Sequence, residues 1–427
     1  MTDRTALDIE INKEEQAGLL DVNDAQRRAV FEKVLQTVDK QFMGPAPDTR
    51  KLREEHEADI LRSDGADRFE EAMSRMLRSL GTSHTGFFHE SRPRSAGRVA
   101  LAATFTKTDT ADGVRWVFQD VHPGGVTAAA GIRPGDILLA VDDKDVAPPE
   151  ATPFTLGRSY TLTIRRADGS TVRPTLAVPG SREKQRPIIV PDVVVTASKI
   201  SADIGVIRVS MFPGVLGMDV ARDISRAISD LGCSRLIIDL RGNTGGGIGC
   251  LRLMSHLCPD SRGVGYSIGR SRARKGYDKE RLPKFNRIPS SKLGVLPLML
   301  KFALAGRSVA VFTEGLGGQI HHGRVVLLAN QHSASAAEMV AAFASEYKLA
   351  TLVGVKTAGR LVATSAFKVG HGYRVVLPVA TYFTWHDNNL EGRGVVPDVE
   401  EPLSADALRA GEDTQLQRAR ACLAEGS

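Results

Sequence analysis

The chain has 427 residues, of which 42% are apolar and 25% are charged, a balance typical of a soluble globular protein with two to four domains. No run approaches the roughly 18 consecutive apolar residues that cross a membrane. The polar start MTDRTALDIEINKEEQ lacks the apolar core of a secretory signal. We therefore predict a cytoplasmic protein without a membrane partner.

The cysteines argue against a metal-binding or disulfide framework. They form no CxxC pair and have no histidine at zinc-finger spacing, so we expect reduced thiols and neither a metal nor another cofactor. The four are Cys233, Cys250, Cys258 and Cys422.

The net charge of +6 is concentrated in one segment. Residues 262–287 carry nine Lys or Arg and two acidic residues, a net charge of +7, which leaves −1 for the rest of the chain. A single basic stretch is more typical of an exposed flap than of a nucleic-acid-binding surface. We therefore predict no nucleic-acid partner, although the segment could receive acidic groups or a peptide carboxylate.

Residues 1–90 predict a helical N-terminal segment. One helix is marked by apolar side chains at helical spacing, followed by Gly81 where a left-handed cap would fall. These side chains are Phe69, Met73, Met76, Leu77 and Leu80. The helix is thus expected to end just before Ser83 and His84.

Residues 91–180 predict a small β-rich module. RVALAATFT (98–106) and VRWVFQDVH (114–122) have the composition of strands, and YTLTIRRADGSTVRPTLAV predicts a hairpin that turns at Asp168-Gly169. Between them, PGGVTAAAGIRPGDILLAVDD predicts a short helix, a Pro-Gly turn and a further strand.

Residues 181–427 predict an α/β domain, because strands alternate with helices from about residue 200 onward. The predicted strands include IGVIRVS, RLIIDLRG, RVVLLAN, ATLVGV and YRVVLPVATYF. The predicted helices include DVARDISRAISDL and SASAAEMVAAFASEY.

Ser333 and Ser335 lie at one strand-to-helix junction, in ANQHSASAAE. Ser335 and Glu338 fit a capping box, in which a hydroxyl and a carboxylate three residues apart satisfy backbone N–H groups. A nucleophile also benefits from this position, because a helix N-terminus stabilises negative charge nearby. Ser333 could cap the helix and leave Ser335 free, so the local pattern leaves capping and catalysis open.

A serine nucleophile needs a base and an oxyanion site. His84 follows Ser83 in the loop GTSHTGFF, and either a base or an ordinary loop histidine fits there. The glycine-rich stretch NTGGG after a buried strand could supply backbone N–H donors or only a tight turn. It matches neither nucleotide-binding glycine motif. Glu391 could orient a polar partner or be a solvated turn residue.

Five motifs occur together in an order that resembles the C-terminal-processing (tail-specific) peptidases and their tricorn-type relatives. They are GTSHTGFF, LIIDLRGNTGG, ANQHSASAAE, VGVKTAG and LEGRGVVPD. PGGVTAAAGIRPGDILLAVDD resembles the PDZ module that these peptidases carry. The resemblance covers roughly residues 65–403. It implies an α/β, crotonase-like layered core with a PDZ-like domain and a helical N-terminal segment.

The resemblance also implies site residues. One branch uses a lysine base in a GKG element, but here Arg360 occupies that place, and arginine does not lose its proton at working pH. Lys356 and Lys368 do not match the motif. The tricorn-like branch uses histidine, which implies Ser335 as nucleophile and His84 as base.

In that branch Ser83 and Glu391 would orient His84. Backbone N–H groups of Gly245 or Gly246 would join that of Ala336 in the oxyanion hole. Ala336 itself departs from the acidic residue that many tricorn-type sequences carry after the nucleophile.

The leading hypothesis is a serine endopeptidase that cleaves protein or peptide substrates near their C-termini. One alternative is a catalytically silent binding protein on the same fold, and another is a PDZ scaffold that binds C-terminal peptides without cleaving them. The sequence does not identify the substrate or the role of residues 262–287, and it is compatible with a homo-oligomer.

Overall fold

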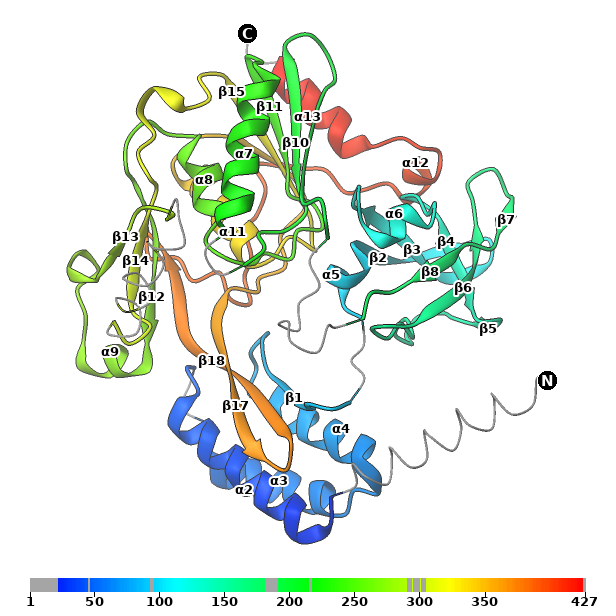
Figure 1. The fold of residues 1–427 in the computed structure, drawn as a ribbon, viewed down its shortest axis with the longest axis vertical. Helices are drawn as coiled ribbons and strands as arrows, with labels where there is room; N and C mark the ends of the chain where they lie inside the picture. The colour runs from blue at the N-terminus through cyan, green and yellow to red at the C-terminus, as the bar shows by residue number, and fades with distance from the viewer. Residues whose placement is uncertain are drawn as a thin grey trace.

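The computed structural model describes residues 22–44, 47–92, 96–180, 191–214, 217–289, 294, 300 and 305–424. The first 21 residues of the predicted helical segment lie outside these ranges. Within them the chain forms a mixed α/β structure with three sheets, arranged as Figure 1 shows. No described helix is both long and apolar enough to cross a membrane.

Three helices form an N-terminal lobe: α2 (Asp24–Gln41), α3 (Thr49–Leu61) and α4 (Gly65–Arg78). They pack against the hairpin of β17 (Val362–Gly370) and β18 (Tyr373–Thr384), at the bottom of Figure 1. The lobe also contributes a strand, β1 (Gly86–His89), which pairs with β18. The loop that carries Ser83 and His84 is therefore fixed between a helix and a sheet.

The β-rich module, residues 96–180, folds as predicted except at its start. Its strands are β2 (Ala103–Thr110), β3 (Gly113–Val121), β4 (Ile137–Val141), β5 (Lys144–Asp145), β6 (Ser159–Arg165), β7 (Thr171–Val172) and β8 (Thr175–Ala177). Its helices are α5 (Arg98–Leu101) and α6 (Val126–Ala129). The strand expected over 98–106 is wrong for its first half. The chain makes one helical turn there and ends it at Ala102 in the left-handed region, with φ 52°.

The strands of the β-rich module form the first sheet. The second sheet has the order β19-β16-β15-β11-β10-β9, and all neighbouring strands in it are parallel except the pair β9 and β10. The strands are β9 (Val195–Lys199), β10 (Ile204–Val209), β11 (Arg235–Asp239), β15 (Arg324–Ala329), β16 (Thr351–Gly354) and β19 (Val399–Glu400). Helices cover both faces, as expected for buried parallel strands. They are α7 (Met218–Leu231), α8 (Cys250–Ser255) and α11 (Ala336–Glu346) on one face, and α13 (Thr414–Ala424) on the other, with α12 (Ala405–Arg409) preceding α13.

The third sheet has the order β1-β18-β12-β14-β13, with β17 paired to β18. Its remaining strands are β12 (Gly263–Gly269), β13 (Lys284–Phe285) and β14 (Val309–Phe312), accompanied by α9 (Arg270–Lys275), η1 (Lys279–Arg281) and η3 (Gly317–Gln319). The interpretation of residues 262–287 as one exposed flap is therefore wrong for its first third, because β12 is largely buried. It holds for α9, which has no buried residue.

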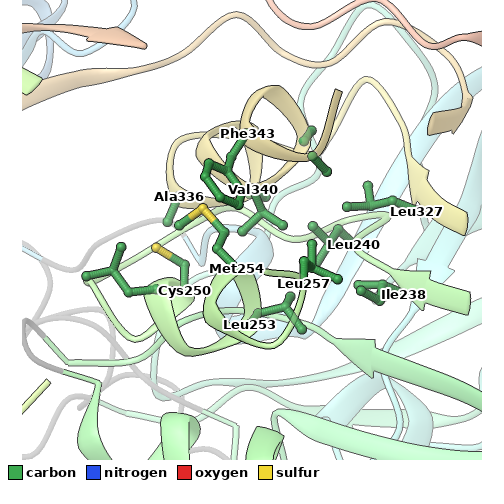
Figure 2. Close-up of a cluster of buried hydrophobic side chains, with 14 of the residues drawn as sticks. Ile238, Leu240, Cys250, Leu253, Met254, Leu257, Leu327, Ala336, Val340 and Phe343 are labelled. Carbon is green, nitrogen blue, oxygen red and sulfur yellow. The ribbon is translucent and has the colours of Figure 1, made fainter. Parts of the chain in front are cut away.

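Helix α11 is anchored by its apolar face. Figure 2 shows Ala336, Val340 and Phe343 of α11 beside side chains of α8, of β15 and of the segments that follow α8 and β11. These neighbours include Met254, Leu257, Leu240 and Leu327. All four cysteines are unpaired thiols, and Cys250 belongs to this core. The packing fixes the N-terminus of α11, and hence Ser335, at the edge of the sheet.

Candidate active site

Two loops meet at the carboxyl edge of the parallel sheet. The glycine loop, residues 240–247, follows β11, and the nucleophile loop, residues 330–335, follows β15. Strands β11 and β15 are parallel neighbours, with Asp239 opposite Leu328, so the loops that leave them lie side by side. The N–H of Ala334 donates to the carbonyl of Asn243 at 2.9 Å, which joins the two loops directly.

Ser335 has a strained backbone, with φ 55° and ψ −118°. For a residue with a β-carbon such a conformation costs about 1–3 kcal/mol and persists only where the surroundings hold it. The N–H of Ser335 donates to the carbonyl of Arg360 and to the carboxylate of Glu338, each at 3.0 Å. Strain of this kind is common at catalytic positions.

The two serines have separate roles. The Ser333 hydroxyl is fully buried, accepts from the N–H of Asn330 at 3.0 Å and donates to the carbonyl of Leu240 at 2.8 Å. Ser333 therefore ties the loops together and does not cap α11, so that alternative is wrong. Ser335 is the N-cap and forms the predicted capping box with Glu338. Ser335 is therefore both the residue that caps α11 and the candidate nucleophile.

Glu338 does more than the capping box requires. Its carboxylate is fully buried and accepts four hydrogen bonds. The donors are the N–H of Ser335 at 3.0 Å, the Thr357 hydroxyl at 2.6 Å, and the N–H groups of Gly359 at 2.7 Å and Arg360 at 2.8 Å. The start of α11 and residues 357–360 are therefore one rigid unit, which local sequence patterns could not show.

His84 and Glu391 are attached to the same unit. The Ser83 hydroxyl lies 2.5 Å from Nδ1 of His84. The Glu391 carboxylate accepts from the N–H of Ser83 and from the N–H of Leu361, each at 2.8 Å. Because Leu361 follows Arg360, whose carbonyl accepts from the N–H of Ser335, a chain of hydrogen bonds through Ser83 and Glu391 connects His84 to the segment that holds Ser335. Glu391 supports His84 through Ser83 rather than by direct contact.

The environment keeps the His84 imidazole neutral. Burial lowers the pKa of His84 below its ordinary value of 6.5, and the fixed charge of Arg360 lowers it further. The carboxylates of Glu391 and Glu338 act in the opposite direction without overcoming the burial. A neutral imidazole at neutral pH is the form that can accept a proton.

The three backbone N–H groups predicted as oxyanion donors differ in availability. Gly245, with φ 90°, packs so tightly that a β-carbon on it would lie 2.5 Å from Cβ of Ser335 and 2.8 Å from N of Ala336. Its own N–H already donates to the side-chain oxygen of Asn243 at 2.8 Å. The N–H groups of Gly246 and Ala336 make no hydrogen bond within the described residues. Gly246 is therefore the better partner for Ala336.

His332 lies in the nucleophile loop with Ser335, and its side chain is buried without a hydrogen-bond partner among the described residues. Neither ring nitrogen has a partner in the described part of the chain, and the side chain is only 6% exposed. Burial lowers the pKa of His332 to about 4. Among the described residues, no cluster of three or more His, Cys, Asp or Glu could hold a metal ion.

Comparison with known proteins identifies relatives of this arrangement. Residues 203–401 match the model of peptidase family S41. The carboxyl-terminal-processing protease of Picosynechococcus sp. is 24% identical over 306 residues, which cover 70% of this chain and 64% of that protein. Carboxyl-terminal-processing peptidase 1 of Arabidopsis thaliana is 23% identical over 340 residues, covering 77% and 61%. The matched region thus spans less than two thirds of these relatives.

Solved structures show the same fold. The photosystem II D1 C-terminal processing protease has a TM-score of 0.54 at 18% identity, covering 89% of this chain and 95% of that one. Mature CPAF complexed with lactacystin has a TM-score of 0.59 at 15% identity, covering 93% and 98%.

Proposed function

We propose, from the match of residues 203–401 to peptidase family S41, that this chain is a serine endopeptidase of that family and cleaves proteins near their C-termini. The observation that carries the proposal is the Glu391 carboxylate, which binds the N–H of Ser83 and the N–H of Leu361. This one side chain joins the histidine loop to the segment that holds Ser335. The preference for C-termini is suggested by the names of the relatives.

The first half of the reaction acylates Ser335. The Ser335 hydroxyl attacks the scissile carbonyl while Nε2 of His84 accepts its proton. This requires the tautomer in which Nδ1–H of His84 donates to the Ser83 hydroxyl. The N–H groups of Ala336 and Gly246 stabilise the oxyanion, a contribution of about 3 kcal/mol per donor in comparable enzymes.

The second half releases the products. The imidazolium of His84 gives its proton to the leaving amine as the C–N bond breaks, which completes the acyl ester of Ser335. Water then attacks this ester with His84 again as base, and the imidazolium returns the proton to the Ser335 oxygen as the ester bond breaks. Arg360 remains charged throughout and cannot exchange protons. It favours the neutral form of His84, as the lowered pKa indicates.

The finer features of the fold belong to the same proposal. The module predicted over residues 91–180 is a PDZ-like domain that receives an extended peptide, and the domain predicted over residues 181–427 is built on a crotonase-like core. The predictions of a cytoplasmic location, of protein or peptide substrates and of a homo-oligomer accompany this proposal. A PDZ-like domain would bind the substrate by strand addition.

A peptide-hydrolysis assay tests the proposal. The full chain is incubated with peptides that end in a free carboxylate or in an amide, and the cleavage sites are mapped by mass spectrometry. We expect cleavage near free C-termini by the wild-type protein and none by Ser335→Ala. Binding without cleavage by both proteins would instead support the catalytically silent alternative. Equal cleavage of amidated peptides would refute the C-terminal preference alone.

A further inference from the structure

The β-rich module contacts both active-site loops through buried polar groups. Asp120, near the end of β3, is 5% exposed, and its two carboxylate oxygens accept from the side-chain amide of Asn330 at 3.2 and 3.0 Å. The Thr104 hydroxyl of β2 also donates to this carboxylate. One residue earlier, Gln119 accepts from the amide of Gln331 at 2.8 Å. Two consecutive residues of the module therefore contact two consecutive residues of the nucleophile loop.

Asn330 carries this contact to both loops. Its side-chain oxygen accepts from the N–H of Gly242 at 3.1 Å and from the N–H of His332 at 3.0 Å. Gly242 lies in the glycine loop, and His332 lies in the nucleophile loop. Asn330 itself is fully buried, so these bonds are sheltered from water. A single amide thus fixes the separation of the two loops while its nitrogen is held by the module.

Asp120 packs closely against the glycine loop at Gly242. Gly242 has φ 73°, and a β-carbon on it would lie 2.9 Å from both Cβ and Oδ2 of Asp120. The nearest cation to Asp120 is Arg208, whose guanidinium lies 3.7 Å away, beyond hydrogen-bond distance, and 3.6 Å from Asp239. The hydrogen-bond capacity of Asp120 is therefore directed mainly at Asn330 and Thr104.

We propose that Asp120 and Asn330 form a positioning pair through which the β-rich module sets the distance between the nucleophile and the oxyanion donors. Neither residue touches the reacting atoms. Asp120 orients the side-chain amide of Asn330. The amide oxygen then accepts from the backbone N–H groups of Gly242 in the glycine loop and His332 in the nucleophile loop. This inference rests on the proposed function, because the distance between the nucleophile and the oxyanion donors matters only if Ser335 is a catalytic nucleophile.

Exchanging the two side-chain types tests the pair. Asn330→Asp places two carboxylates against each other, which breaks the contact between module and loops. Adding Asp120→Asn restores it with reversed polarity. One oxygen of Asp at 330 accepts from Gly242 and His332, and the other accepts from the new amide at 120. The Asn at 120 keeps an oxygen for the Thr104 hydroxyl.

The readouts are the rate of acylation by a fluorophosphonate, the hydrogen exchange of peptides covering residues 240–247 and 330–335, and the melting temperature. We expect Asn330→Asp to slow acylation by about tenfold to a hundredfold and to accelerate exchange in both loops. The double variant should return both readouts to within about threefold of wild type. Gln119→Ala, which removes the neighbouring bond to Gln331 but no bond to Gly242, serves as the control and should leave the acylation rate and the exchange of residues 240–247 nearly unchanged.

Unchanged acylation and exchange in Asn330→Asp would overturn the proposal. So would a double variant that recovers its melting temperature but not its acylation rate or loop protection. If the wild-type protein is not acylated at all, the proposed function fails, and the exchange measurements still decide whether Asp120 and Asn330 hold the loops. If Asn330→Asp does not fold, the double variant alone decides, because it should fold and show wild-type loop protection.

Discussion

At the scale of single residues, the charges around His84 set the pH at which the site works. Burial and Arg360 lower the pKa of His84, while Glu391 raises it. Removing Arg360 should therefore raise this pKa and move the acidic limb of the acylation profile to higher pH. Removing Glu391 should move the limb to lower pH.

The matched variants are Arg360→Gln and Glu391→Gln, assayed as fluorophosphonate acylation rate against pH. Glu391→Gln should also lower the plateau, because its amide cannot accept from both Ser83 and Leu361. Limbs that move in the same direction in the two variants would show that the ionising group is not His84.

A second residue-scale prediction concerns Gly245. Gly245→Ala would place a methyl group 2.5 Å from Cβ of Ser335, and we expect acylation to fall at least about a hundredfold. Gly169→Ala is the matched control, because Gly169 has a similar φ of 81° and no atom within 4 Å of the added carbon. Both variants place a β-carbon at a positive φ. Equal acylation in the two proteins would therefore disprove a crowded nucleophile.

Sequence reasoning at this scale found the types of residue but not all of their partners. The motifs that contain Ser335, Ser83, His84 and Glu391 are local and recognisable, and the bonds from Ser83 and Leu361 to Glu391 link the segments that carry them. Three of the four bonds accepted by Glu338 come from Thr357, Gly359 and Arg360, which lie 19 to 22 residues further along the chain. No local pattern around Glu338 encodes these three bonds.

At the scale of elements, α11 is held at its N-terminus by Glu338 and near its C-terminus by Glu346. Glu338→Gln replaces one carboxylate oxygen with an NH₂ group. At least one of the four donors, on Ser335, Thr357, Gly359 and Arg360, would then lack an acceptor. We expect the free energy of unfolding to fall by about 2–5 kcal/mol and acylation to slow strongly.

The control on the same helix is Glu346→Gln. Glu346 accepts from Thr384 at 2.6 Å and from Asn388 at 2.7 Å, far from Ser335 in the chain. The free energy of unfolding in denaturant and the acylation rate should distinguish the two variants. We expect both variants to be less stable than the wild type, but only Glu338→Gln to be acylated more slowly. A loss of acylation with Glu346→Gln of equal size would contradict a local role for Glu338.

Helices and strands whose apolar residues recur at a clear helical or strand spacing were predictable. The helix at 218–231 and the strands at 204–209, 235–239 and 324–329 follow their apolar patterns. The turn at Arg98–Leu101 was not predictable, because a short apolar run has no period that separates helix from strand. Strands β12 and β17 were also missed. The charges next to β12 and the exposed side chains of β17 hide the strand pattern.

At the scale of the whole molecule, distant segments complete one another. Strand β1 pairs Gly86 with Val376, and Phe87 stacks on Tyr373 at 4.9 Å between ring centres. The sequence predicted a helical N-terminal segment but not that its last strand joins the third sheet. Pairings across nearly three hundred residues leave no local signal in a single sequence.

Buried histidines make the stability of the whole fold depend on pH. The pKa of His332 is lowered to about 4 by burial, with Arg98 and Arg360 lowering it and Asp120 opposing them. Between pH 6.5 and about 4 the unfolded chain binds a proton that the folded chain does not, so stability falls as the pH falls through this range. The loss from this one group reaches about 3 kcal/mol.

Urea unfolding of wild type and His332→Gln at pH 7 and pH 4.5 measures this contribution. The variant should lose less stability than the wild type between the two pH values. His122 also has a pKa lowered to about 4 by burial and remains in both proteins, so the difference isolates His332. An equal loss in the two proteins would show that His332 is not a neutral buried group.

The central claim is that His84 activates Ser335. The measurement that tests it most directly is the site and rate of fluorophosphonate labelling in the wild-type protein and in His84→Ala, with the modified residue identified by peptide mass mapping. Our account predicts a label on Ser335 in the wild-type protein and its near-complete loss in a folded His84→Ala variant. Labelling of Ser335 at the wild-type rate without the imidazole would contradict it.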